Sequence, residues 1–425
     1  MLKTLQRRTF LGGVGVSLAG IWSLPGVALA QSTRAVSGPS ELEAALQQAG
    51  AGTVFLLSAG DFGSVRLEGV GGASGQPWVI RSADRANPAR ISGLRLDGAH
   101  DIEFEDLTFD YRFQTGQPSS LRPFRITNST HITIRDSVFD GDVAQGVTPE
   151  TDGFGTAHGL NIGGCAYVTI EGCEFHTFLR GIVVGGCTDL VIRGNNLHGL
   201  RSDGMDFVHV ERTLIEENYI HDFNKALGSG DHSDMIQFWT NRSEAPTRDV
   251  VIRNNVLNSG HGWFTQSIFM RNDLVDRGLA GDEMFYRNIT IEGNVIINAH
   301  LHGITVGETD GLFIRNNTVV RNARSEGNTD NLSLWTPRIN VSGAARNVEI
   351  LRNVTNRIVG YAGQPDWTVA DNLMVQDVGR LAEGLFYDRV FVDALTGDPS
   401  DLASFAYLPG GPLDGTGIGA PRLAQ

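Results

Sequence analysis

One position recurs along much of this chain, at the end of short aliphatic segments such as VTIEGCEF, LVIRGNNL, TLIEENYI and VVIRNNVL. The repeat distance is close to 22 residues and is lengthened in some repeats by an inserted loop. Apolar and polar residues alternate within each segment, as in a half-buried strand and unlike a helix. A fixed period of this size predicts a solenoid in which each repeat forms one coil. The recurring residues are Cys173, Asn195, Asn218, Asn255, Asn294, Asn317 and Asn353.

The asparagines at this position are expected to be structural. An asparagine at a bend can bond to its own backbone, tolerates left-handed geometry and can pair with the asparagine one coil away. The same strand pattern occurs upstream in IEFEDLTF and ITIRDSVF, so regular coils are predicted over about residues 100–355.

Residues 1–30 have the features of a segment that directs export. They contain two adjacent arginines, a modest apolar run broken by glycine and a small-residue A-L-A site, and so resemble a twin-arginine signal. The run is short for a membrane span, and no other segment is apolar enough for one. We therefore expect a periplasmic or secreted protein whose residues 31–425 form a single domain, with no membrane association once the signal is removed.

Charge and cysteine content exclude other classes of protein. The formal net charge is −14, and removing residues 1–30 takes away Lys3, Arg7 and Arg8, which leaves −17. Nucleic acid is not an expected partner of such an acidic chain. The odd number of cysteines, two of them at matching points of adjacent coils, predicts buried thiols rather than a disulfide framework.

The two ends of the repeat region differ from its middle. The stretch SELEAALQQ followed by TVFLL predicts a short amphipathic helix and a strand that cap the open end of the solenoid. The stretch after it, GGASGQPWVIRSADRANPARISGLRLDGAHDIEFEDLTF, resembles the N-terminal part of right-handed parallel β-helix polysaccharide lyases, particularly the chondroitinase B and alginate lyase group. This resemblance implies a right-handed parallel β-helix. Residues 357–425 are predicted to be an irregular packed tail without chemistry.

A second strand in each coil can be aligned by an apolar-x-apolar triplet, for example Leu160/Ile162 and Met205/Phe207. Stacking these triplets in register makes every intervening residue point outward on one common sheet. The predicted outward residues are Asn161, Val183, Asp206, Gln237, Phe269, Thr305 and Asn340.

Positions that flank the triplets, and loops that precede them, add polar side chains to the same face. Neighbouring coils lie about 4.8 Å apart, so residues distant in sequence become neighbours. Loops bring Lys225, Asp231 and His232 to the middle of this face and His261 to its wall. A groove across several coils suits a polymer. The strand residues expected to converge there are Arg180, Asp203, Asp206, Asp234, Gln237, Trp239, Arg271 and His302.

Lys225 stands out because it is the single lysine in residues 31–425, where arginine supplies all other positive charge. One interpretation is a surface lysine on a flexible loop. The other is a base or a charge-neutralising group, since the pKa of a lysine falls when it is crowded or desolvated.

These residue types suit proton abstraction next to a carboxylate, the first step of β-elimination or of C5 epimerisation in a uronate polymer. Such a site needs a cation on the carboxylate, a base beneath C5 and a proton donor. Arg271 is the predicted cation and can form a bidentate pair with the carboxylate. His232 or Lys225 is the predicted base, and Asp231 and Asp234 are expected to orient the imidazole.

Two family resemblances bear on this chemistry. The segment Asp231-His232-Ser233-Asp234, with Arg271 one coil later, resembles the Asp-Pro-His-Asp segment of mannuronan C5-epimerases and related lyases, and this implies that His232 is the base. Chondroitinase B-like lyases have a catalytic lysine on the strand where this chain has Gln237, so that lysine is absent from its usual place.

The expected function is cleavage of an acidic polysaccharide by β-elimination. Three alternatives remain: a uronate C5-epimerase, a glycoside hydrolase, and a non-catalytic glycan-binding β-helix. The hydrolase interpretation rests on Ser202-Asp203-Gly204-Met205-Asp206, Asp234 and Gly260-His261-Gly262, which resemble elements of polygalacturonases. No cofactor is required by the pattern, although Asp203, Asp206 and Asp234 offer oxygen ligands suited to Ca²⁺. The predicted substrate-binding residues are Arg180, Asp203, Asp206, Gln237, Trp239, His261 and His302.

Overall fold

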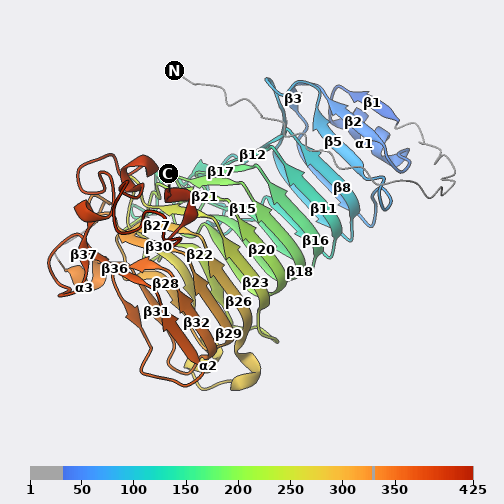
Figure 1. Cartoon of the computed structure of the whole chain (residues 1–425). Helices are drawn as coiled ribbons and strands as arrows, with labels where there is room; N and C mark the ends of the chain where they lie inside the picture. Colours follow the sequence, from blue (N-terminus) through green and yellow to red (C-terminus); the bar gives the residue numbers. More distant parts are fainter. Residues whose placement is uncertain (1–31, 328–330, 425) are drawn as a thin grey trace, which may run out of the picture. The chain divides into compact units, whose positions relative to one another are not determined.

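Each repeat contributes three short strands, and strands of successive coils pair in parallel. The computed structural model describes residues 32–327 and 331–424, so the predicted export signal lies outside the described residues. Figure 1 shows the coils side by side from the N-terminal to the C-terminal end of the repeat region. Every pairing between coils is parallel within the described residues, and each coil visits three stacks of strands in the same order. The fold is the predicted right-handed parallel β-helix.

Stack A carries the aliphatic segments that reveal the repeat. In the described residues its strands belong to a 22-stranded sheet that also contains stack B. They are β1 (Thr33–Val36), β2 (Val54–Leu57), β5 (Trp78–Ser82), β8 (His100–Glu105), β11 (Thr130–Arg135), β16 (Ala166–Glu171), the later parts of β18 (Arg180–Arg193) and β20 (Met205–Glu216), β23 (Arg248–Arg253), β26 (Tyr286–Glu292), β29 (Thr309–Arg315), β32 (Arg346–Leu351) and β35 (Trp367–Ala370).

Stack B carries the apolar-x-apolar triplets. Its strands are β4 (Ser64–Glu68), β7 (Gly93–Asp97), β10 (Phe124–Thr127), β15 (His158–Gly163), the first parts of β18 and β20, β22 (Asp234–Trp239), β25 (Gln266–Met270), β28 (His302–Val306), β31 (Arg338–Val341) and β34 (Ile358–Val359).

Stack C is the 13-stranded sheet of the described residues. Its strands are β3 (Gly60–Asp61), β6 (Ala89–Ile91), β9 (Thr108–Asp110), β12 (Val138–Asp140), β17 (Glu174–His176), β19 (Asn196–His198), β21 (Tyr219–His221), β24 (Val256–Asn258), β27 (Val295–Asn298), β30 (Thr318–Arg321), β33 (Val354–Thr355), β36 (Leu373–Gln376) and β37 (Leu385–Phe386). The stacked strands thus extend on both sides of the range 100–355 given by the sequence pattern.

The recurring asparagines form a buried ladder between stacks A and C. Asn218 Nδ2 donates to Asn255 Oδ1 at 2.9 Å, and Asn255 Nδ2 donates to Asn294 Oδ1 at 3.0 Å. The ladder reaches one rung beyond the sequence pattern, to Asn372. The left-handed conformation belongs to the residue before each rung, for example Asn254 with φ 55°, and not to the rung itself. The predicted pairing between coils is therefore confirmed.

One apolar core runs along the inside of the coils, and an N-terminal helix extends it. The rings of Phe109, Phe139 and Phe175, one from each of three neighbouring coils, stack with centroids 4.4 and 4.3 Å apart. Helix α1 (Pro39–Gln47) buries Leu42 and Ala45 in the same core, in agreement with the predicted cap. All three cysteines are buried free thiols. None of the helices in residues 32–327 and 331–424 is long and apolar enough to cross a membrane.

The C-terminal tail covers the outer face of stack C. Tyr387, Phe391, Phe405 and Tyr407 pack against outward valines and isoleucines of β24, β27 and β30 in a second apolar cluster. The other short elements of the described residues are the hairpin β13 (Asp142–Val143) with β14 (Gly155–Thr156), the helices α2 (Asp273–Asp276) and α3 (Leu332–Trp335), and the 3₁₀ turns η1 (Asp282–Met284), η2 (Tyr387–Arg389), η3 (Leu402–Phe405) and η4 (Pro421–Leu423).

Candidate functional site

The register of stack B places the predicted outward residues in one row. Asn161 pairs with Val183, Val183 with Asp206, and Asp206 with Gln237. The row continues from Gln237 to Phe269, Thr305 and Asn340. Because the triplets are buried on the core side, the residue between them faces outward.

Three carboxylates and one guanidinium form the centre of this face. Asp203 lies two residues before β20, Asp206 is its second residue, and Asp234 begins β22 one coil later; all three side chains are 0% exposed. Arg180, at the start of β18, contacts Asp203 through Nε at 3.1 Å and Asp206 through Nη1 at 3.0 Å. The Arg180 side chain is 29% exposed, so it lies over these two carboxylates and faces solvent itself.

Burial and crowding raise the pKa of these carboxyl groups. Burial is the main cause for Asp203, whose pKa rises to about 7, and the neighbouring Asp234 adds to it. Burial likewise raises the pKa of Asp206, where Arg180 acts in the opposite direction, and of Asp234, where His232, Lys225 and Arg180 do so. Placing several acids together in a dry site has this effect because the charged forms repel and lose hydration.

His232 is the exposed member of the cluster. Its Nδ1 lies 2.8 Å from Asp234 Oδ2 and 3.8 Å from Asp203 Oδ1, and its side chain is 59% exposed. The hydrogen bond with Asp234 is the main cause that raises the pKa of His232. Since Nδ1 faces the carboxylate, Nε2 is the ring nitrogen available to a bound molecule.

Lys225 lies on the loop between β21 and β22. Its Nζ lies 4.9 Å from the centre of the Phe264 ring. Desolvation lowers its pKa, while Asp234, Asp203 and Asp231 act in the opposite direction. The single lysine of the described chain therefore lies within electrostatic reach of the carboxylate cluster.

The loops on this side meet one another. Gly228 lies against Glu150 of the loop between β13 and β14, so the two loops form a joined wall. Asp231 is predicted to orient the imidazole of His232, but the structure shows no contact between them. Asp231 pairs with the buried Arg201, whose Nη2 lies 2.6 Å from Asp231 Oδ2, and it accepts a hydrogen bond from Ser229 Oγ. Asp231 anchors the loop, and Asp234 alone orients the imidazole.

Arg271 does not join the cluster. Arg271 directly follows β25, and the register of β25 with β22 sets it beside Trp239. Trp239 is five residues beyond Asp234 along β22. At about 3.3 Å per residue, the backbone there lies about 17 Å from that of Asp234. Its Nε lies 2.7 Å from Asp276 Oδ2 of α2. The predicted convergence of Arg271 and His232 on one sugar is therefore not observed, and Arg180 is the arginine next to the histidine.

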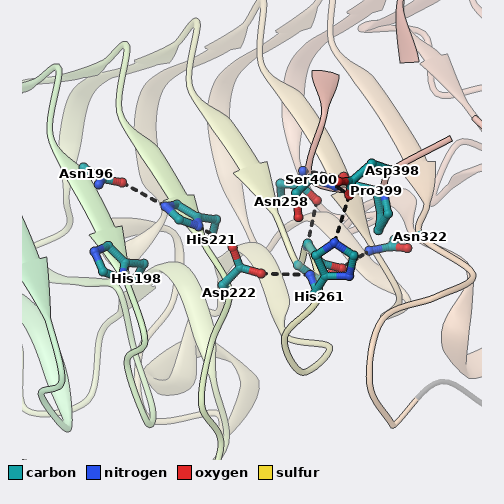
Figure 2. A network of polar contacts seen from close by, with 12 residues as sticks. Asn196, His198, His221, Asp222, Asn258, His261, Asn322, Asp398, Pro399 and Ser400 are labelled. Carbon is teal, nitrogen blue, oxygen red and sulfur yellow. Dashed lines mark hydrogen bonds and ion pairs between the residues drawn. The ribbon is translucent and has the colours of Figure 1, made fainter. Parts of the chain in front are cut away.

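His261 is also held elsewhere (Figure 2). Its backbone N–H donates to Asp222 Oδ1 at 2.8 Å, and its Nε2 lies 2.9 Å from Asp398 Oδ1 of the tail. The side chain is 66% exposed in the turn after β24, on the side of stack C. It does not form a wall beside the carboxylates as expected.

The remaining predicted binding residues lie around the cluster. Gln237 is paired in register with Asp206 and is nearly buried, and the guanidinium of Arg180 lies 5.9 Å from the ring of Trp239. His302 lies two coils beyond Asp234, where its Nδ1 bonds to Thr305 Oγ1 at 2.8 Å. Burial lowers the pKa of His302 to about 4, so it is neutral near pH 7.

The side chains of the cluster suit a metal ion that binds both nitrogen and oxygen ligands better than they suit Ca²⁺. Among the described residues, Asp203, His232 and Asp234 have potential ligand atoms within 4.8 Å of one another. Calcium takes six to eight oxygen ligands, whereas mixed imidazole and carboxylate sets suit transition metals. Arg180 already neutralises Asp203 and Asp206. These residues therefore do not fit a dedicated calcium site.

Sequence reasoning missed Arg201, the anchoring role of Ser202 and the upstream part of the outward row. Arg201 and Ser202 hold the loop from one coil before, where Ser202 Oγ donates to the backbone oxygen of His232 at 2.9 Å. The outward row of stack B also continues upstream through β10, β7 and β4. The signal was present in the triplets VRL, LRL and FRI, which have the same apolar-x-apolar form.

Comparison with known proteins agrees with this architecture. The family model described as "Right handed beta helix region" matches residues 126–353, more than half of the chain. The chain belongs to the right-handed β-helix family. No curated protein sequence matches it.

Several solved structures are similar to this chain at low sequence identity. The tailspike protein of Dettilon is 14% identical over 82% of this chain, with a TM-score of 0.48, and this β-helix chain spans 64% of its length. The surface adhesin PfbA of Streptococcus pneumoniae is 13% identical over 79% of this chain and 85% of its own, with a TM-score of 0.45. A mannuronic acid-specific family 6 polysaccharide lyase from human gut microbiota is 14% identical over 83% and 88% of the two chains, with a TM-score of 0.40.

Proposed function

We propose that this β-helix protein cleaves an acidic, uronate-containing polysaccharide by β-elimination, with His232 as the base. One observation carries the proposal: an exposed imidazole whose Nδ1 is held by a fully buried carboxylate lies near a partly exposed guanidinium that comes from two coils earlier. This arrangement orients the base and leaves a cation free on one side to meet the substrate carboxylate.

The proposed step uses groups of the cluster in named roles. Arg180 binds the uronate carboxylate and makes the C5 proton more acidic. His232 Nε2 removes that proton, the electron pair forms the C4–C5 double bond, and the bond from C4 to the bridging oxygen breaks. Lys225, whose pKa is lowered by desolvation, supplies the proton that the leaving oxygen takes up. Proton count and charge balance without any external oxidant or reductant.

Exposure favours elimination over hydrolysis. A glycosidase needs carboxyl groups that reach the bridging oxygen and a water. Here Asp203, Asp206 and Asp234 are 0% exposed beneath Arg180 and His232, whereas the imidazole is open to solvent. C5 epimerisation begins with the same proton abstraction and differs only in whether the proton returns to the opposite face, so it is the second candidate.

The test is incubation with a panel of uronate polymers, followed by the ultraviolet absorbance of the unsaturated product. New reducing ends without that absorbance indicate a hydrolase, and solvent deuterium at C5 without cleavage indicates an epimerase. His232→Ala is expected to abolish product formation. His261→Ala is the matched control, because His261 is a similarly exposed histidine outside the cluster. Equal activity of wild type and His232→Ala would overturn the assignment.

A further inference from the structure

A row of arginines lies on the outer face of stack B, upstream of the cluster. Arg66 in β4 pairs in register with Arg95 in β7, and Arg95 pairs with Arg125 in β10. All three side chains are exposed, and the apolar residues on either side of each arginine are buried. Successive guanidinium groups therefore start from backbone positions about 4.8 Å apart along the coil axis.

These arginines have few acidic partners. Arg66 pairs with Glu68 on its own strand. For the described part of the chain, no ion pair joins Arg95, Arg125 or the adjacent exposed Arg122 to a carboxylate, and the nearby Asp97 lies within the electrostatic influence of Arg95 and Arg125. Repulsion between stacked like charges disfavours such a row, and the chain has a net charge of −14, so this concentration of positive charge is local.

The row leads directly to the carboxylate cluster. Arg125 pairs with Asn161 in the next coil, which continues through Val183 to Asp206. A cavity of about 540 Å³ lies over the row and is lined by Arg66, Arg95, Arg122 and Arg125. Arg180 lies on the same face of stack B, two coils beyond Arg125.

We propose that Arg66, Arg95, Arg122 and Arg125 bind the non-reacting part of a polyanionic glycan that extends along the coils. The ligand class follows from the geometry, because one cation per coil in a straight row matches a polymer with an acidic group on each of several successive sugars. Arginine suits this task since its planar fork binds a carboxylate through two parallel hydrogen bonds. The choice of a uronate polymer rests on the proposed function, whereas the requirement for a row of anions does not.

The experiment measures binding of long and single-sugar uronates to the whole protein in a His232→Ala background, which prevents turnover. The probes are labelled oligomers of polymannuronate and polygalacturonate, with the free uronic acids and a neutral oligosaccharide of equal length. The test variant is Arg95→Ala/Arg125→Ala. The control is Arg81→Ala, which removes an exposed arginine from β5 of stack A, on another face.

We expect the double variant to bind a long oligomer about tenfold more weakly or worse, and Arg81→Ala to bind it normally. Binding of the long oligomer should weaken as the salt concentration rises. The affinities of single uronic acids and of the neutral oligosaccharide should be the same in wild type and in the double variant. Equal affinity of the double variant, or an equal loss in Arg81→Ala, would overturn the proposal. Equal binding of single-stranded DNA through the same arginines would also overturn it as a glycan site.

The experiment distinguishes failure of the arginine-row proposal from failure of the proposed elimination reaction. If the oligomer binds through the arginine row but the active protein forms no unsaturated product, the row stands and the elimination mechanism fails. If product forms and the double variant binds and cleaves long and short substrates like wild type, the mechanism stands and the row fails.

Discussion

Replacing Asn255 with alanine removes a central rung of the asparagine ladder. The side chain is 0% exposed. Its Oδ1 accepts hydrogen bonds from the backbone N–H and the Nδ2 of Asn218, at 3.0 and 2.9 Å. Its Nδ2 donates to the backbone oxygen of Ile215 and to Asn294 Oδ1, both at 3.0 Å. The substitution therefore deletes four hydrogen bonds at a place that water does not reach.

The cost follows from which groups lose their partners. The N–H of Asn218 becomes a buried donor without an acceptor, which costs about 1–3 kcal/mol, and each remaining lost bond contributes about 0.5–1.5 kcal/mol. Allowing for partial relaxation, we expect Asn255→Ala to lower the free energy of unfolding by about 3–5 kcal/mol. That is a large part of the stability of a typical protein, which is about 5–15 kcal/mol.

Asn372→Ala provides the matched control because it removes the last rung. Asn372 accepts from Asn353 and donates to Ile350 and Ala370, but it is partly exposed, so water can replace these contacts. We expect a loss of no more than about 1.5 kcal/mol. Urea denaturation followed by circular dichroism measures both. Equal losses, or a loss below about 1 kcal/mol for Asn255→Ala, would show that the ladder is not stabilised by burial of its hydrogen bonds.

Three further predictions concern the cluster. In Asp234→Asn the largest cause of the raised pKa of His232 is removed, so the acidic limb of the rate–pH profile should move to lower pH while the maximal rate falls by about 10²–10⁴. Arg180→Lys should cleave more slowly than wild type, because one ammonium cannot bridge Asp203 and Asp206 as the guanidinium does, and steady-state kinetics on a long substrate would show it. Prolonged EDTA treatment should leave product formation unchanged, as the proposed mechanism uses no metal, and Zn²⁺ bound between His232 and Asp234 should inhibit it.

Each of these three predictions has an outcome that would contradict it. A pH limb that does not move in Asp234→Asn would mean that the imidazole does not titrate in the rate-determining step. Full activity in Arg180→Lys would remove the guanidinium from substrate binding. Loss of activity with EDTA, restored by a divalent cation, would require a metal in the reaction.

Periodic features of the sequence predicted the fold well. The outward row of stack B from Asn161 to Asn340 is predicted residue by residue, because a buried triplet fixes both the register and the direction of the residue between its members. The strand period also located the asparagine ladder. These features depend on neighbouring positions and on burial, which a sequence pattern records directly.

The candidate site was predicted less well, because long polar side chains choose between partners that sequence position does not reveal. Arg271 turns to Asp276 on the short helix that follows it. His261 is held by Asp398, which lies 137 residues away in the tail. Asp231 pairs with Arg201 from the preceding coil. In each case an acid or base outside the aligned columns forms the contact.

The tail that covers stack C has a consequence for biosynthesis. The outward apolar residues of β24, β27 and β30 are covered by tail residues that include Tyr387, Phe391, Leu413 and Leu423. During synthesis the early coils can therefore form while the outward apolar residues of β24, β27 and β30 are still exposed to solvent. These residues are a target for chaperones until translation is complete, and a premature stop codon near residue 380 would yield a product prone to aggregate.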